Sequence, residues 1–158
     1  MARILITYFS STGHTKKMAE AIAKGASLDG CEVLIKESGG MTTEDFLAAD
    51  AIIIGSPTYY GSMAYEMKKL IDATVKIHGK LEGKVGGAFA SSGMLGGGNE
   101  TTVRSLLDAL LIHGMVVLGS SKIAHYGPVA IGSPDDQATK ECRIYGERIA
   151  RLAMKLAQ

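Results

Sequence analysis

The chain has 158 residues, a length that fits one domain spanning 1–158. Its 17 Lys and Arg residues nearly balance its 16 Asp and Glu residues, so it lacks the basic surplus of a protein that coats nucleic acid. A hydrophobic share of 46% argues against disorder, and no apolar run approaches the roughly 20 residues of a membrane span.

Apolar runs alternate with helix-period segments along the chain. Short, nearly continuous apolar runs predict strands at 2–8, 33–35, 51–54, 85–90 and 115–118. Apolar residues at helical spacing predict helices at 15–26, 43–48, 64–76, 100–113 and 137–157. We expect Gly55 and Pro57 to stop the third strand, and a loop of about 18 residues to lead into the last helix.

Five alternations of strand and helix predict an α/β protein, a three-layer α/β/α sandwich around a five-stranded parallel sheet with right-handed crossovers. Because the strands are apolar throughout, we expect both faces of the sheet to be covered. The last helix is expected to bury four side chains, namely Tyr145, Ile149, Leu152 and Leu156.

Ligands of open parallel sheets bind beyond the carboxyl ends of the strands. The loop after the first strand contains Ser10, Ser11, Thr12, Gly13, His14 and Thr15. Its hydroxyls and the free N–H groups of a helix start suit a phosphate, although a simple helix cap would need one of these hydroxyls. Neither GxxxxGK[ST] nor the dinucleotide GxGxxG occurs in this turn, which indicates a mononucleotide held mostly by neutral donors.

The loops after the third and fourth strands supply aromatic rings and flexible backbone. The former contains Pro57, Thr58, Tyr59, Tyr60 and Gly61, and the latter contains Ser91, Ser92, Gly93, Met94, Leu95, Gly96 and Gly97. The tyrosines could stack on a flat heteroaromatic ligand, or one could pack on the following helix. The glycine-rich backbone could donate hydrogen bonds to the edge of a heterocycle, or form a plain surface loop.

These three loops together resemble those of flavodoxin-like FMN proteins, and more closely those of the WrbA-type NAD(P)H:quinone oxidoreductases. The segment from Pro57 to Met63 is similar to their PTxxGxM loop, and Ser91 to Glu100 is similar to their S-[ST]-G…GG-x-E loop. Three further segments that also fit are His113-Gly114-Met115, Tyr126-Gly127 and Tyr145-Gly146-Glu147. The similarity therefore runs the whole length of the chain.

The resemblance implies a flavodoxin-like strand order of 2-1-3-4-5 and FMN as the cofactor. By it, Ser10 to Thr15 hold the phosphate. Thr58, Tyr59 and Tyr60 flank the isoalloxazine with the Gly61 backbone nearby, and Ser91 to Gly97 cover its pyrimidine side. The implied activity is electron transfer between a reductant and an acceptor, or NAD(P)H:quinone (or flavin) oxidoreduction with bound FMN.

Two departures separate this chain from the WrbA type. Its insertions after the second and fifth strands are short or missing here, and Ile112 stands where that type has a histidine. A flavin-free signalling domain on the same topology would need an acidic cluster after the first strand, where this chain has Ser10, Ser11 and Thr12.

The remaining features concern partners and compartment. Cys31 and Cys142 are too few for a disulfide framework, and the short apolar run after Arg3 is not a secretion signal, so we expect a cytoplasmic protein. The expected partners are a redox protein, or NAD(P)H and a quinone, with a homo-oligomer also possible. No metal site, nucleic acid or membrane span is expected.

Overall fold

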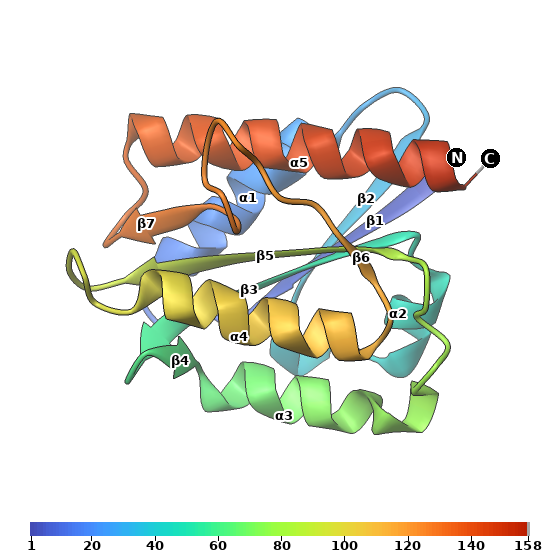
Figure 1. Cartoon of the computed structure of the whole chain (residues 1–158), viewed down its shortest axis with the longest axis horizontal. Helices are drawn as coiled ribbons and strands as arrows, with labels where there is room; N and C mark the ends of the chain where they lie inside the picture. The colour runs from blue at the N-terminus through green and yellow to red at the C-terminus, as the bar shows by residue number, and fades with distance from the viewer. Residues whose placement is uncertain (158) are drawn as a thin grey trace.

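A parallel β-sheet forms the middle layer of the computed structural model, which describes residues 1–157 (Figure 1). Its main path runs in the order β2-β1-β3-β5-β6. These strands are β1 (Ala2–Tyr8), β2 (Cys31–Glu37), β3 (Ala51–Tyr59), β5 (Val85–Ser92) and β6 (Val116–Val117). Since β5 and β6 are the fourth and fifth strands of the sequence analysis, the flavodoxin-like order is confirmed.

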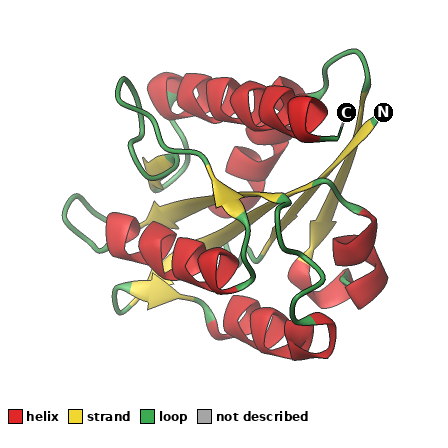
Figure 2. Cartoon of the chain, turned by 45° about the vertical axis from the view of Figure 1, so that its right-hand side comes forward, coloured by secondary structure: helices red, strands yellow, loops and turns green. Residues whose placement is uncertain are grey.

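Helices cover both faces of the sheet (Figures 1 and 2). They are α1 (His14–Ala26), α2 (Thr43–Ala48), α3 (Tyr65–Ala73), α4 (Asn99–Ile112) and α5 (Asp136–Leu156). On β1, Ile4 and Ile6 belong to the core beneath α1 and α5, whereas Leu5 belongs to the core beneath the other helices. The period of two in a strand thus divides one apolar run between two cores.

Short 3-10 turns extend two of these elements. The expected helix at 64–76 is α3 followed by the 3-10 turn η2 (Thr74–Ile77), and β2 is followed by η1 (Ser38–Gly40). At the start of α2, Thr42 Oγ1 accepts the backbone N–H of Asp45 while the Asp45 carboxylate accepts that of Thr42. This capping box stabilises a helix that is only six residues long.

The third strand is longer than expected. It continues through Gly55 and Pro57, because Thr58 and Tyr59 pair with a short antiparallel strand, β4 (Ser62–Met63). Gly55 does not end the strand; a side chain there would overlap the ring of Phe89, so the glycine makes room for that core residue. The expectation that Gly55 and Pro57 stop the strand was therefore wrong.

The fifth strand is divided into two pieces. Both β6 and β7 (Val129–Ile131) pair in parallel with β5, one near each end, and residues 118–128 leave the sheet between them. The connection expected to be a plain loop before the last helix thus contains a strand. That strand lengthens the sheet beside the carboxyl end of β5.

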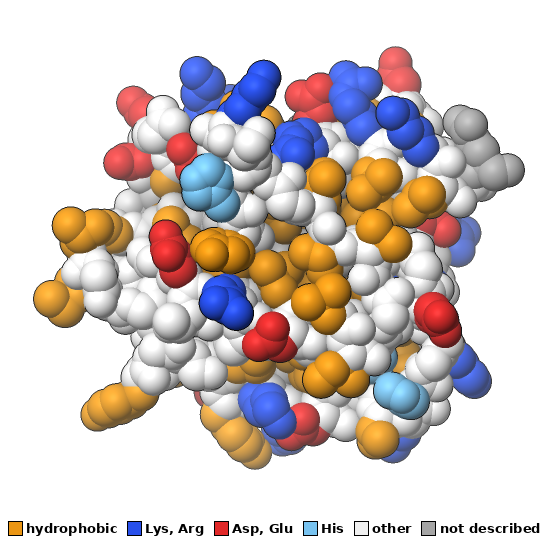
Figure 3. Space-filling view, in the orientation of Figure 1, with side chains coloured by type: hydrophobic (Ala, Val, Ile, Leu, Met, Phe, Trp, Pro, Cys, Tyr) orange, Lys and Arg blue, Asp and Glu red, His pale blue; other side chains and the backbone are white. Residues whose placement is uncertain are grey.

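Coverage of the sheet is less complete than expected. On the edge strand β2, Leu34 is 43% exposed and Ile35 is 38% exposed, and Leu156 at the end of α5 is 55% exposed rather than buried. Apolar side chains also gather on the face shown in Figure 3, between α4 and α5. Within residues 1–157, no helix has both the length and the apolar character needed to cross a bilayer.

Candidate functional site

The turn after β1 prepares the start of α1. Gly13 has a left-handed φ of 88° at the N-cap, and Ser10 Oγ accepts the N–H groups of Gly13 and Lys16 at 3.1 and 3.3 Å. The Ser10 hydroxyl thus accepts two backbone N–H groups at the start of the helix, while Gly13 is the N-cap residue. The N–H groups of His14 and Thr15 are in the first turn, where a helix offers no backbone acceptor.

The β3–β4 hairpin presents the two tyrosines. Tyr59 pairs with Ser62, which leaves Tyr60 and Gly61 as a two-residue turn with φ values of 51° and 76°. Two positive φ angles match a type I′ turn, whose twist suits a hairpin but is costly for a tyrosine. Tyr60 is fully exposed at the tip.

The segment after β5 is open backbone. Ser91 and Ser92 are the last two residues of the strand and are buried, so they were wrongly expected in a loop. A Cβ atom added to Gly93 or to Gly96 would have no neighbouring atom within 4 Å. Met94 and Leu95 at the tip are 66% and 84% exposed.

Hydrogen bonds join the three segments at one edge of the sheet. The Thr15 and Ser91 hydroxyls are 2.9 Å apart, and the Ser11 hydroxyl is 3.0 Å from that of Tyr59. In the parallel register, Pro57 of β3 lies beside Ser91 of β5. All three predicted segments therefore meet.

Residues outside the predicted set complete these links. Thr101 Oγ1 donates to the Gly61 carbonyl at 2.7 Å, and Asn99 Nδ2 donates to Ser92 Oγ at 3.2 Å. A side chain on Gly98 would come within 2.8 Å of Gly61 Cα, so the hairpin and the start of α4 touch through backbone. Sequence reasoning missed Thr101, which forms part of α4 and has no signature of its own.

The chemistry of this edge fits a phosphorylated flat ring. The Thr58 hydroxyl is buried and has no hydrogen-bond partner among the described residues, which is costly unless a further group reaches it. Thr12, in the turn before α1, and Tyr60, at the hairpin tip, are both exposed. Tyr8, buried at the end of β1, has its pKa raised by burial and then by the charges of Glu37 and Glu20, so it stays neutral.

Comparisons with known proteins agree over nearly the whole chain. Residues 3–127 match the model of the NADPH-dependent FMN reductase family. A flavodoxin of Aquifex aeolicus is 42% identical, over 95% of this chain and 86% of that protein. An NAD(P)H dehydrogenase (quinone) of Archaeoglobus fulgidus is 36% identical, over 99% of this chain and 100% of that protein.

A solved structure gives the same picture. The crystal structure of the flavodoxin, WrbA-like protein from Agrobacterium tumefaciens is 32% identical in sequence to this chain and superposes with a TM-score of 0.83. The superposition covers 98% of this chain and 99% of that one. The similarity therefore includes all three segments described above.

Proposed function

The chain belongs to the NADPH-dependent FMN reductase family, and we propose that it acts within that family as a flavodoxin-like electron carrier. It is a flavodoxin-like FMN redox protein, as the resemblance of its loops implies. FMN supplies the electron-transfer chemistry when bound, and the protein supplies binding, orientation and electrostatics. We further propose one domain over 1–158, and a cytoplasmic setting, which the free thiols of Cys31 and Cys142 support.

The observation that carries the proposal is the meeting of three segments at the carboxyl ends of β1, β3 and β5. In the proposed complex, Ser10 to Thr15 bind the phosphate through first-turn N–H groups and the Thr12 hydroxyl. The hairpin from Pro57 to Gly61 places Tyr59 and Tyr60 against the isoalloxazine. The segment from Ser91 to Gly97 donates backbone N–H groups to the pyrimidine edge.

A second candidate function is NAD(P)H:quinone oxidoreduction. Similarity to the NAD(P)H dehydrogenase (quinone) of Archaeoglobus favours it, and so do the exposed side chains of Tyr60, Met94 and Leu95 around the site. They would give a nicotinamide or quinone ring an apolar surface beside the flavin. The short connections after the second and fifth strands, where the WrbA type has insertions, favour the carrier. Ile112, where that type has histidine, ends α4 on the side away from the three segments and does not decide between the two functions.

Titration of the purified protein with FMN tests the cofactor site. We expect a shifted two-banded flavin spectrum, quenched flavin fluorescence and saturation at one equivalent of FMN. Tyr60→Ala should weaken binding about tenfold, since one stacking aromatic contributes about 1 kcal/mol or more. Tyr126→Ala removes an exposed tyrosine outside the three segments and should leave binding unchanged. Failure to bind FMN at all would overturn the proposal.

Steady-state oxidation of NADPH in the presence of benzoquinone separates the two functions. The carrier proposal predicts that the FMN-loaded protein oxidises NADPH no faster than free FMN does. Rapid turnover that Tyr60→Ala reduces and Tyr126→Ala does not would assign the reductase function instead.

A further inference from the structure

The outer edge of β2 carries unpaired backbone groups. Within residues 1–157, β2 ends the sheet and pairs with β1 alone. Ala2 lies beside Cys31, and its N–H donates to the Gly30 carbonyl. In a parallel ladder, alternate residues bond to the neighbouring strand. The N–H and C=O groups of Leu34 therefore point toward β1, and those of Val33 and Ile35 point outward. The outward groups are free to pair with another strand.

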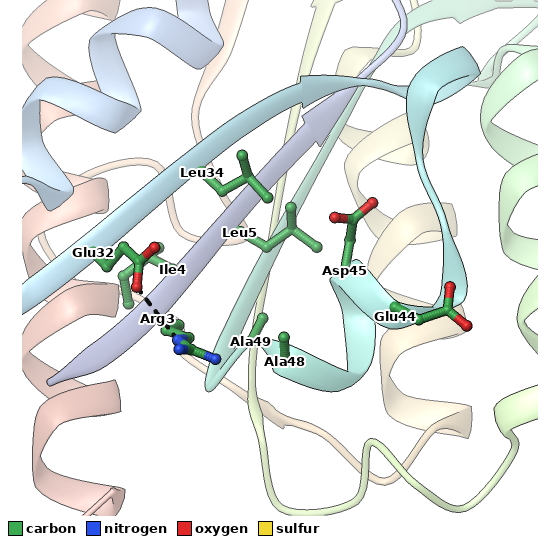
Figure 4. Close-up of a pocket in the computed structure, with 9 residues that line it drawn as sticks. All are labelled: Arg3, Ile4, Leu5, Glu32, Leu34, Glu44, Asp45, Ala48 and Ala49. Atoms are coloured by element: carbon green, nitrogen blue, oxygen red, sulfur yellow. Dashed lines mark ion pairs between the residues drawn. The ribbon is translucent and has the colours of Figure 1, made fainter.

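The side chains along this edge are more apolar than an isolated edge usually allows. Leu34 and Ile35 are 43% and 38% exposed, on opposite faces of the strand. Figure 4 shows Leu34 and Leu5 projecting side by side from the two strands on the side of α2, where Ala48 and Ala49 line the same hollow. A long apolar edge of this kind is a template for strand pairing.

The order of residues in β2 is complementary to itself. Leu34 is the middle residue of the seven-residue strand, and the five central residues read Glu-Val-Leu-Ile-Lys. An antiparallel second copy, turned about Leu34, brings Glu32 opposite Lys36 and Val33 opposite Ile35. Opposite charges and β-branched pairs on facing strands are favourable.

The hydrogen-bond phase fits the same register. Val33 of one copy and Ile35 of the other face each other as a hydrogen-bonded pair, because the backbone groups of both residues point outward from their own sheets. Leu34 then faces its own copy in a non-hydrogen-bonded pair, where Cα atoms come closest, about 4.5 Å apart. A register shifted by one residue would place Glu32 or Lys36 opposite an apolar residue.

Charges inside each copy extend the complementarity. Arg3 Nε lies 3.3 Å from Glu32 Oε2, and Lys36 Nζ lies 2.8 Å from Asp45 Oδ2. Across the two-fold axis the order of charges becomes Arg3, Glu32, then Lys36 and Asp45 of the second copy. Positive and negative groups alternate, an arrangement that networks of charges need to be favourable.

We propose that the protein forms a two-fold homodimer in which the β2 strands of two copies pair antiparallel about Leu34. The sheets of the two copies then join into one. The apolar side chains between α4 and α5 carry no comparable proposal, because β6 has only two residues and no self-complementary charges. The dimer leaves the carboxyl ends of β3 and β5, two and three strands from the joined edge, open to redox partners.

Sedimentation velocity over a range of concentrations tests this dimer with charge reversals. E32K puts a cation opposite Lys36 of the second copy, and K36E puts an anion opposite Glu32, so each should weaken dimerisation about tenfold or more. An equimolar mixture of the two variants should dimerise, since each mixed pair regains both attractions. As a control, Glu66→Lys makes the same change in net charge as E32K, but on the exposed face of α3, and should leave the dimer intact.

A cross-link provides a second test that does not depend on charge. Leu34→Cys should form an intermolecular disulfide under mild oxidation, because the two side chains face each other across the axis. Wild-type protein should not form this link, because Cys142 is buried and the half-buried Cys31 lies opposite Glu37 of the second copy, at the other end of the strand from that copy's Cys31. A wild-type chain that stays monomeric at every concentration, a dimer that E32K does not weaken, or a mixture that stays monomeric would each overturn the proposal.

Discussion

Glycine has different roles in two regions of the molecule. Where α1 crosses α5 it allows close packing, and at the carboxyl edge of the sheet it leaves the backbone open. A side chain on Gly146 would overlap the Ile22 carbonyl, and one on Gly25 would overlap that of Arg143, so two helix backbones touch. A side chain on Gly93 would meet nothing within 4 Å. At the crossing, glycine lets two helix backbones pack in direct contact. At the carboxyl edge, it leaves backbone groups accessible. Substitutions in the two regions should therefore separate stability from binding.

The largest loss of stability is expected for Gly146→Ala. Its methyl group would overlap the Ile22 carbonyl and lie 3.0 Å from the Ala26 nitrogen, and backbone cannot give way as a flexible side chain can. Overpacking of this kind typically costs up to about 3 kcal/mol of unfolding free energy. Urea denaturation followed by circular dichroism measures the loss.

Gly93→Ala is the matched control from the other region. Because it meets open space, we expect a change in unfolding free energy of about 0.5 kcal/mol or less. In the proposed complex its added methyl group lies next to the flavin, so FMN affinity should fall while stability holds. Equal effects of the two substitutions on stability would remove the distinction between the regions.

Tyr145→Phe should have the next largest effect, again on stability. The hydroxyl of this fully buried residue of α5 accepts the Ala88 backbone N–H at 3.0 Å, and burial raises its pKa to about 12. The substitution leaves a buried donor of β5 without its acceptor, which costs about 1–3 kcal/mol. Urea denaturation should show the loss, and Tyr65→Phe, at an exposed position, should show none.

The sequence predicted the packed region better than the carboxyl edge, for a physical reason. A buried strand such as β1 is recognisable from its own apolar run, and its predicted bounds are the observed ones. The end of β3 depends on pairing with β4, and β7 depends on pairing with β5, which are tertiary contacts that a local pattern does not encode. The loop chemistry was still visible, because hydroxyls, tyrosines and glycines are local features; Thr101 was missed because its role arises only when the hairpin reaches α4.

Tyr60→Gly sharpens the comparison from the other side, by improving stability at the carboxyl edge. Glycine accepts the positive φ of 51° at no steric cost, so the substitution should stabilise the fold by about 1 kcal/mol. The same change removes the exposed ring, and FMN affinity should fall. Thermal unfolding without flavin and FMN titration measure the two effects. A Tyr60→Gly protein that is less stable would show that the ring, not the turn, holds the hairpin.

The smallest effect is expected at His113, which follows the end of α4 farthest from the loops. Its Nε2 lies 2.8 Å from Thr74 Oγ1, and burial, followed by the nearby His78, lowers its pKa. Below the ordinary histidine pKa of about 6.5, the unfolded chain therefore binds a proton that the folded chain resists, so stability falls as the pH drops through this range. His113→Gln should flatten the dependence of urea midpoints on pH between about 7 and 5. FMN affinity should be the same in both proteins, because the residue lies outside the three segments that meet at the carboxyl edge. A flavin affinity that follows the protonation of His113 would instead couple this far end of α4 to the carboxyl edge of the sheet.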